Sequence, residues 1–327
     1  MKIMFYDTKP YDKIWFEPLG EEMGFQIKFQ EIRLNEDTAV LARGYDAVCI
    51  FVSDDADKKA IQVLKEIGIR TILLRCAGFN NVDLKAAQAA GIQVLRVPSY
   101  SPEAVAEYAM GLLLTVNRQI HRAYTRTRDF NFNINGLMGI DLVGKTAGVI
   151  GTGKIGQMMI DILKGFKMRI LAYDPFPVEG LGVEYVELDE LFRSSDVITL
   201  HCPLTKDTKH IINKRSINKM KDGVILVNTS RGALINTSDL IDGLMERKFT
   251  GVGLDVYEEE DEYFFEDKSN ELITDDDLIR LTSFRNVVLT SHQAFFTKDA
   301  MEAIARVTLE NAKAVEEGRE LKNIVLP

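Results

Sequence analysis

The chain has 327 residues, 46% of them apolar, which is enough to build two hydrophobic cores. Its 40 basic and 49 acidic residues give a net charge of −9, and such a surface repels a polyanion. Length and charge therefore predict two domains and argue against nucleic acid as a partner.

The amino-terminal segment begins with an apolar stretch that Asp7, Pro10 and Asp12 interrupt. This stretch is too short for a signal peptide or a membrane-spanning helix, so we expect a soluble, cytoplasmic protein with no membrane partner. The cysteines are odd in number and lack CxxC spacing, which predicts buried free thiols and neither a disulfide frame nor a metal site. They are Cys49, Cys76 and Cys202.

The first hundred residues contain five short β-rich runs that alternate with helical patterns. Alternation of this kind predicts a parallel sheet with helices on its faces. The runs are KIMFY, QIKFQ, DAVCIFV, RTILL and IQVLRV.

A long helical pattern follows the first run of elements. It opens with Pro102 after a capping Ser101 and stays apolar on one side up to Tyr124. The pattern predicts one continuous helix over residues 102–124.

A second run of six strand patterns starts at Thr146, and six is the strand number of a complete dinucleotide-binding sheet. The strands are TAGVIG, RILAYD, DVITLHC, GVILVNTS, TGVGLDV and NVVLTSH. A last amphipathic helix, 298–318, is predicted to return to the first domain. The predicted domains are therefore 1–100 plus 298–327, and 101–297.

The motif GTGKIG at 151–156 lies between a predicted strand and a predicted helix. Free N–H groups at that helix start can bind a pyrophosphate, although glycines also serve ordinary tight turns. Asp174 ends the next strand, 18 residues after Gly156, where a carboxylate can bind the ribose hydroxyls or simply form a turn. No arginine follows it, so the joint spacing favours NAD over NADP.

Three ionisable side chains follow three predicted strands: Arg231, Glu260 and His292. The carboxyl ends of parallel strands share one sheet edge, where ligands bind. A guanidinium can bind a substrate carboxylate, and a histidine oriented by a carboxylate can protonate a carbonyl oxygen. Each residue alone also fits an ordinary surface role, and Glu258 and Glu259 compete with Glu260. The combination favours reduction of a 2-keto acid.

With these motifs the chain resembles the D-isomer-specific 2-hydroxyacid dehydrogenases over nearly its whole length. Within that family it is most similar to the NAD-dependent D-lactate dehydrogenases, through Tyr100, the YFFED stretch and HQAFFT. The matching segments are RCAGFNNVD, VPSYSPEAVAEYA, GTGKIG, HCPLT, NTSRG, GLDVYEEE and SHQAFFT.

The resemblance implies an α/β fold of two doubly wound parallel-sheet domains, a Rossmann domain that binds NAD and a flavodoxin-like substrate domain. It implies that Arg231 binds the substrate carboxylate, that His292 is the acid/base and that Glu260 is its partner. Substrate contacts are implied for Ala77, Gly78, Tyr100 and Phe295. Cofactor contacts are implied for Gly151, Thr152, Gly153, Lys154, Ile155, Gly156, Asp174, Cys202, Pro203, Thr208, Thr229, Ser230 and Asp255. The remaining histidines are expected outside the site, His121 and His210 at the surface and His201 at a strand end.

The implied reaction is reversible hydride transfer between NADH and pyruvate, which gives D-lactate after closure of the domains and proton donation by His292. A homodimer through the helix after Pro102 is the expected assembly. Two alternatives stay open. One is a larger 2-keto acid substrate, such as 2-ketoisocaproate or phenylpyruvate, and the other is an NAD-sensing corepressor of the same fold.

Overall fold

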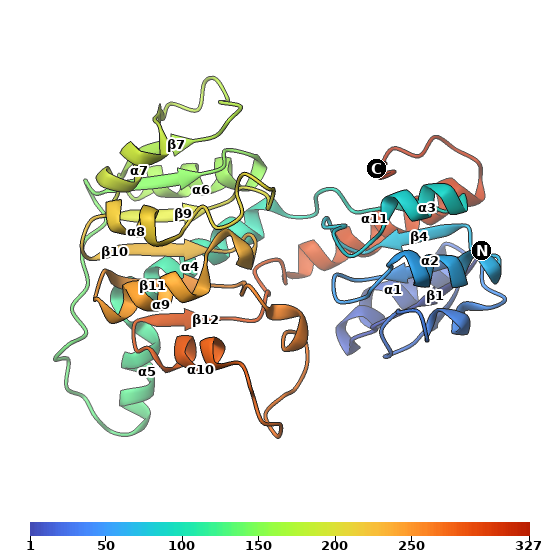
Figure 1. Ribbon diagram of the computed structural model, residues 1–327, viewed down its shortest axis with the longest axis horizontal. Coiled ribbons are helices and arrows are strands. Elements are labelled where there is room, and N and C mark those ends of the chain that lie inside the picture. The colour runs from blue at the N-terminus through green and yellow to red at the C-terminus, as the bar shows by residue number, and fades with distance from the viewer. The chain divides into compact units, whose positions relative to one another are not determined.

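The computed structural model describes all residues, 1–327, and divides them into two compact units. Unit 1 contains residues 1–101 and 296–327, and unit 2 contains residues 102–295. These bounds differ from the predicted ones by one residue at the first junction and by two at the second. Each unit is a parallel sheet with helices (Figure 1), which confirms the predicted fold class.

Unit 1 is built on a five-stranded sheet of order β2-β1-β3-β4-β5, in which every pair of neighbours is parallel. This is the strand order of flavodoxin-like folds. All five strands were predicted, and β3 and β4 are buried throughout. The strands are β1 (Lys2–Phe5), β2 (Gln26–Phe29), β3 (Ala47–Ile50), β4 (Thr71–Leu74) and β5 (Gln93–Leu95).

The carboxyl-terminal helix α11 (Lys298–Glu316) belongs to unit 1, as predicted, where it packs against α1 and β4. Thr297 caps its start by accepting a hydrogen bond from the Ala300 N–H, and Ile324 beyond it forms a bridge with Leu95. Unit 1 is therefore discontinuous in sequence. Its other helices are α1 (Pro10–Glu22), η1 (Ala39–Ala42), α2 (Lys58–Glu66) and α3 (Leu84–Ala90).

A buried arginine joins the carboxyl ends of β1 and β4. The Arg75 guanidinium lies 4.4 Å from the Phe5 ring and 4.8 Å from the Phe51 ring. It donates to the Asp7 carbonyl oxygen at 2.7 Å and lies 3.6 Å from the Asp12 carboxylate. A charge so fully removed from water needs such partners, so this cluster fixes one arrangement of the strand ends.

Unit 2 is built on a seven-stranded parallel sheet of order β12-β11-β10-β9-β6-β7-β8. All six predicted strands are present, and the sequence did not reveal the two-residue edge strand β8. The Rossmann order is formed by β8-β7-β6-β9-β10-β11, and β12 adds a seventh strand beside β11. The strands are β6 (Thr146–Ile150), β7 (Arg169–Tyr173), β8 (Glu184–Tyr185), β9 (Val197–Leu200), β10 (Val224–Asn228), β11 (Phe249–Leu254) and β12 (Val287–Leu289).

Helices cover both faces of this sheet (Figure 1). The first face packs against α4 (Pro102–Arg118) and α6 (Lys154–Gly165), and the second against α7 (Leu188–Ser194), α8 (Lys214–Lys219) and α9 (Thr237–Met245). The remaining helical segments of unit 2 are α5 (Ile120–Arg128), η2 (Gly232–Leu234), η3 (Glu260–Glu262) and α10 (Asp276–Ser283).

The prediction of one continuous helix over residues 102–124 is wrong. The helix ends at Arg118, Gln119 adopts a left-handed conformation (φ 50°, ψ 40°), and α5 then starts in a new direction. The apolar stripe of α4 ends at Val116, and none of the α5 residues is buried. The chain leaves the sheet at this point, and the apolar residues of α5, Ile120 and Tyr124, stay exposed.

The three cysteines are buried free thiols, as predicted. None of the helices combines the length and the apolar character that a membrane span requires.

Candidate active site

The three predicted ionisable residues follow three neighbouring strands of unit 2. Arg231 lies three residues after β10, Glu260 opens η3 after β11, and His292 lies three residues after β12. Because β10, β11 and β12 are adjacent and parallel, all three residues lie at one edge of the sheet.

His292 and Glu260 form a direct pair, with 2.7 Å between His292 Nδ1 and Glu260 Oε1. The second carboxylate oxygen, Oε2, accepts a hydrogen bond from the Tyr257 N–H at 2.9 Å. The carboxylate is thus fixed at both oxygens, and it holds the ring through Nδ1. This leaves Nε2 as the nitrogen that can exchange a proton with a substrate.

The structure resolves the choice among the neighbouring glutamates. Glu258 accepts a 2.5 Å hydrogen bond from His210 Nε2, and its other oxygen accepts two from Thr237, while Glu259 is exposed. Burial alone would raise the pKa of Glu258, but its hydrogen bonds with His210 and Thr237 lower it on balance. The sequence predicted His210 at the surface; its side chain is half-buried and is hydrogen-bonded to Glu258.

His292 lies in a turn of unusual backbone conformation. Its φ of 51° is in the left-handed region, which non-glycine residues rarely adopt. The His292 N–H donates to the Asp255 carbonyl oxygen at 2.7 Å. Strain of this kind is kept where the surrounding structure imposes it, and it commonly marks functional sites.

The Asp255 side chain imposes this turn. It is fully buried, and its Oδ1 accepts hydrogen bonds from Thr290 Oγ1 at 2.6 Å and from the Gln293 N–H at 3.0 Å. Its Oδ2 accepts one from the Ala294 N–H at 2.7 Å. Burial raises the pKa of Asp255, and these hydrogen bonds oppose that shift. With both oxygens occupied inside the protein, the geometry favours a positioning role over the cofactor contact implied by the resemblance.

Arg231 is held by its backbone and leaves most of its guanidinium donors unused. Asn228 Nδ2 donates to the Arg231 carbonyl oxygen at 2.8 Å, and Arg231 Nη1 donates to the Ser230 carbonyl oxygen at 2.7 Å. A Cβ on the next residue, Gly232, would lie 2.0 Å from the Tyr257 carbonyl oxygen. The turn that carries Arg231 thus packs directly on the residue whose N–H holds Glu260.

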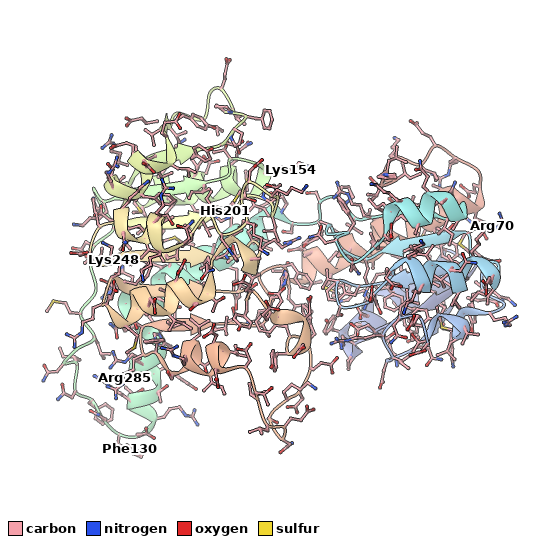
Figure 2. All side chains as sticks on the ribbon, in the orientation of Figure 1. Arg70, Phe130, Lys154, His201, Lys248 and Arg285 are labelled. Atoms are coloured by element: carbon pink, nitrogen blue, oxygen red, sulfur yellow. The ribbon has the colours of Figure 1, made fainter.

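The glycine turn after β6 has the geometry of a phosphate cradle. Gly151 has a φ of 96° and no room for a Cβ beside Cys202, and a Cβ on Gly156 would lie 2.0 Å from the Gly151 carbonyl oxygen. A Cβ on Gly153 would instead meet open space. The first and third glycines are needed for packing, and the second leaves the start of α6 accessible to a pyrophosphate. Figure 2 labels Lys154 at this start and His201 at the end of β9.

Asp174 lies next to this turn. Its Oδ2 accepts hydrogen bonds from the Thr152 N–H at 2.7 Å and from Thr152 Oγ1 at 3.2 Å. Its Oδ1 accepts one from the Phe176 N–H at 2.9 Å. The carboxylate predicted to bind the ribose is therefore oriented before any nucleotide arrives.

The other predicted cofactor residues lie on the loops after β9 and β10. Ser230 Oγ donates to the Cys202 carbonyl oxygen at 2.7 Å, which ties the two loops together. Burial raises the pKa of the Cys202 thiol to about 11. Thr208 Oγ1 donates to the Pro203 carbonyl oxygen at 2.6 Å and so folds its own loop.

Two further predicted cofactor residues differ in what surrounds them. Thr229 Oγ1 is buried without a hydrogen-bond partner, which leaves a polar atom for a ligand group to satisfy. Ile155 is half-buried in the first turn of α6 and contributes an apolar side chain beside the glycine turn.

The predicted substrate residues of unit 1 follow β4 and β5. The N–H groups of Ala77 and Gly78 make no hydrogen bond within the chain, so two adjacent donors are free. Arg96 holds this turn by donating to the Ala77 carbonyl oxygen at 2.9 Å. Tyr100 is half-buried, and Phe295, in unit 2, is buried.

Taken together, the Rossmann sheet, the glycine cradle with Asp174 and the Glu260–His292 pair define an NAD-dependent oxidoreductase. Comparison with known proteins agrees with this class. Residues 110–294 match the model of the D-isomer specific 2-hydroxyacid dehydrogenase, NAD binding domain. The chain belongs to the D-isomer-specific 2-hydroxyacid dehydrogenase family.

Similar proteins extend the match to the whole chain. A 2-hydroxyacid dehydrogenase homolog of Haemophilus influenzae is 55% identical over 100% of both chains. D-Lactate dehydrogenase of Escherichia coli is 52% identical over 99% of both. The solved apo-structure of the E. coli D-lactate dehydrogenase covers 100% of both chains with a TM-score of 0.91 and 49% identity.

Proposed function

We propose that this protein is a D-lactate dehydrogenase, which transfers a hydride reversibly between NADH and pyruvate. The observation that carries the proposal is the Glu260–His292 pair, held at the same sheet edge as Arg231. The similarity to a protein named D-lactate dehydrogenase supports the substrate assignment. Such a reaction would regenerate NAD during fermentation.

His292 acts as the acid/base. With Nδ1 held by Glu260, protonated His292 presents Nε2–H to the carbonyl oxygen of pyruvate and donates its proton as the alcohol forms. In the reverse direction the neutral ring takes that proton back. The Glu260 carboxylate holds the ring in one orientation through Nδ1.

Arg231 binds the substrate carboxylate. Its planar guanidinium can form two parallel hydrogen bonds, which fix the keto acid in one orientation. The resemblance also implies substrate contacts for Ala77, Gly78 and Tyr100 in unit 1 and for Phe295 in unit 2.

The residues around the glycine turn fit NAD. Its pyrophosphate would lie against the N–H groups at Gly153 and Lys154, and its adenosine ribose would bind Asp174. The Thr229 hydroxyl would find a partner in the nicotinamide half. When bound, the coenzyme supplies or accepts the hydride.

The proposal also includes a cytoplasmic homodimer. The segment after α5 exposes a series of large apolar side chains, among them Phe130 at 83% and Phe132 at 72% exposure. An apolar segment of this kind marks a contact surface in a protein of ordinary composition. The three unpaired thiols suit a reducing compartment.

A panel of 2-keto acids tests the function. Pyruvate, 2-ketoisocaproate and phenylpyruvate are each mixed with enzyme and NADH, the loss of NADH absorbance is followed, and the chirality of the product is determined. We expect the highest kcat/KM for pyruvate and only D-lactate as its product. A higher kcat/KM for a larger keto acid would contradict the lactate assignment, and NADH binding without turnover would favour the corepressor alternative.

A further inference from the structure

A chain of hydrogen bonds runs from the β7–β8 loop to the carboxylate of Asp174. The Val178 N–H donates to the Tyr185 hydroxyl at 2.9 Å, and the Tyr185 hydroxyl donates to Thr152 Oγ1 at 2.9 Å. Thr152 Oγ1 in turn donates to Asp174 Oδ2 at 3.2 Å. Each hydroxyl accepts one bond and donates the next. The Tyr185 hydroxyl also reaches the Val178 carbonyl oxygen, but at the longer distance of 3.5 Å, so the shorter bond leads toward the carboxylate.

Burial makes the central link of this chain costly to break. Thr152 is fully buried, so its hydroxyl has no water to replace a lost partner. Because a carboxylate can only accept, the Thr152 hydroxyl donates to Asp174 Oδ2, and its lone pairs are left to accept from Tyr185. The same Asp174 oxygen also accepts the Thr152 N–H at 2.7 Å.

The backbone around Tyr185 keeps the tyrosine in place. Tyr185 lies on the edge strand β8 opposite Ala172 of β7, and β7 separates it from β6, the strand that leads into the glycine turn. The Val186 N–H continues the pairing by donating to the Ala172 carbonyl oxygen at 3.0 Å. Lys164 on α6 donates to the Leu181 carbonyl oxygen and so fastens the loop between β7 and β8.

We propose that Tyr185 is a positioning residue for the coenzyme, which acts through Thr152 to fix the ribose-binding carboxylate of Asp174. The consequence is selectivity for NAD. A fixed carboxylate keeps its oxygens aimed at the 2′- and 3′-hydroxyls of the adenosine ribose and opposes a 2′-phosphate at the same place. The inference rests on the proposed role of Asp174.

The test is a double-mutant cycle with Tyr185→Phe, Thr152→Val and the two combined. For each variant, KM is measured for NADH, NADPH and pyruvate, kcat is measured with saturating substrates, and thermal melting reports whether the fold is intact. Tyr45→Phe is the matched control, because Tyr45 is a half-buried tyrosine of unit 1 whose hydroxyl makes no hydrogen bond within the chain.

We expect Tyr185→Phe to raise KM for NADH about three- to ten-fold, which corresponds to the loss of one neutral hydrogen bond. The ratio of kcat/KM for NADH to that for NADPH should fall by a similar factor, while kcat and KM for pyruvate stay within two-fold. Because both substitutions break the same chain, the double variant should be no worse than Thr152→Val alone. Thr152→Ser, which keeps the hydroxyl, should retain most of the NADH affinity.

An unchanged KM for NADH in Tyr185→Phe would overturn the inference. It would also be overturned if the effects of Tyr185→Phe and Thr152→Val on the free energy of NADH binding were additive in the double variant. Asp174→Ala distinguishes a failure of the role proposed for Asp174 from a failure of the role proposed for Tyr185. If that variant binds NADH normally, the proposed role of Asp174 fails. If it binds NADH weakly while Tyr185→Phe does not, only the inference about Tyr185 fails.

Discussion

At the scale of single residues, His292 illustrates how much three-dimensional contact adds to the sequence. Its position after a strand, together with Arg231, predicts chemistry at the sheet edge. The partner of its ring could not be chosen from sequence, because Glu258, Glu259 and Glu260 are consecutive. Only the fold shows that Glu258 is occupied by His210 and Thr237, whereas Glu260 bonds His292 Nδ1.

The same limit applies to Asp255 and Tyr185. An aspartate after a strand reads equally well as a ligand or as a turn anchor, and only its buried contacts with Thr290, Gln293 and Ala294 distinguish the two. Tyr185 carries no motif at all. Its contribution depends on hydrogen bonds with Thr152, which is distant in sequence, and with Val178. Both bonds need Tyr185 to be held on the edge strand β8, which the sequence did not reveal.

His201 provides a prediction about pH. Burial lowers its pKa from 6.5 to about 4, and Nε2 bonds Thr199 Oγ1 at 2.8 Å. Because the pKa of His201 is lower in the folded protein, the ring binds a proton in the unfolded chain at pH values where it is still neutral in the native protein. The stability contributed by the neutral ring is therefore complete above pH 6.5 and is lost as pH falls toward 4.

Chemical denaturation at pH 7.5 and pH 5.0 checks this prediction. Replacing His201 by Gln removes the titration, so the variant should lose less stability between these pH values than the wild type. The expected difference is on the order of 2 kcal/mol, from about 1.4 kcal/mol per pH unit below pH 6.5. Equal losses in both proteins would show that His201 is not the group responsible.

At the scale of elements, local patterns predicted the strands that place the site. β10, β11 and β12 are apolar runs followed by polar residues, and strands of this kind stand out in sequence. Two elements escaped prediction for physical reasons. The strand β8 is too short to show a period, and the break at Gln119 arises where α5 leaves the sheet, although no proline or glycine marks it.

The turn that carries His292 yields a prediction at this scale. Asp255→Asn replaces one of the two acceptor oxygens by an NH₂ group, which cannot accept a hydrogen bond. Either the bond from the Ala294 N–H or the bonds from Thr290 and the Gln293 N–H are then lost. We expect a loss of about 1–3 kcal/mol in the free energy of unfolding. We also expect a lower kcat with little change in KM for NADH, because the left-handed turn at His292 loosens.

Denaturant unfolding and steady-state kinetics of Asp255→Asn measure both effects. Asp222→Asn is a suitable control, because the Asp222 side chain is 92% exposed. If Asp255→Asn kept the stability and the kcat of the wild type, the positioning role assigned to Asp255 would be refuted.

At the scale of the whole molecule, the alternation of strands and helices was sufficient to predict two α/β units and the return of the carboxyl-terminal helix to the first. Parallel sheets need a crossover between successive strands, so the alternation of strand and helix patterns can be recognised in the sequence. The surface through which chains assemble is harder to recognise. The apolar residues after α5 resemble core residues until the fold shows them exposed.

The proposed homodimer can be tested at these residues, which lie in the segment that runs along the outside of unit 2 after α5 (Figures 1 and 2). Replacing Phe130 and Phe132 by Ser should shift the protein from dimer to monomer, because it removes two exposed aromatic anchors. Sedimentation velocity over a range of concentrations measures the shift. Phe176→Ser is the matched control, because Phe176 is 84% exposed on the β7–β8 loop. A wild type that is monomeric at all concentrations would rule the assembly out.

The most direct test of the whole account is a single turnover of the enzyme–NADH complex with pyruvate, followed by NADH absorbance in the wild type and in His292→Ala. The account predicts that both proteins bind NADH with similar affinity. It also predicts that hydride transfer in the variant is slower by about 10²- to 10⁴-fold, because the proton donor is missing. A variant that oxidises NADH at nearly the wild-type rate would contradict the assignment of His292 as the acid/base.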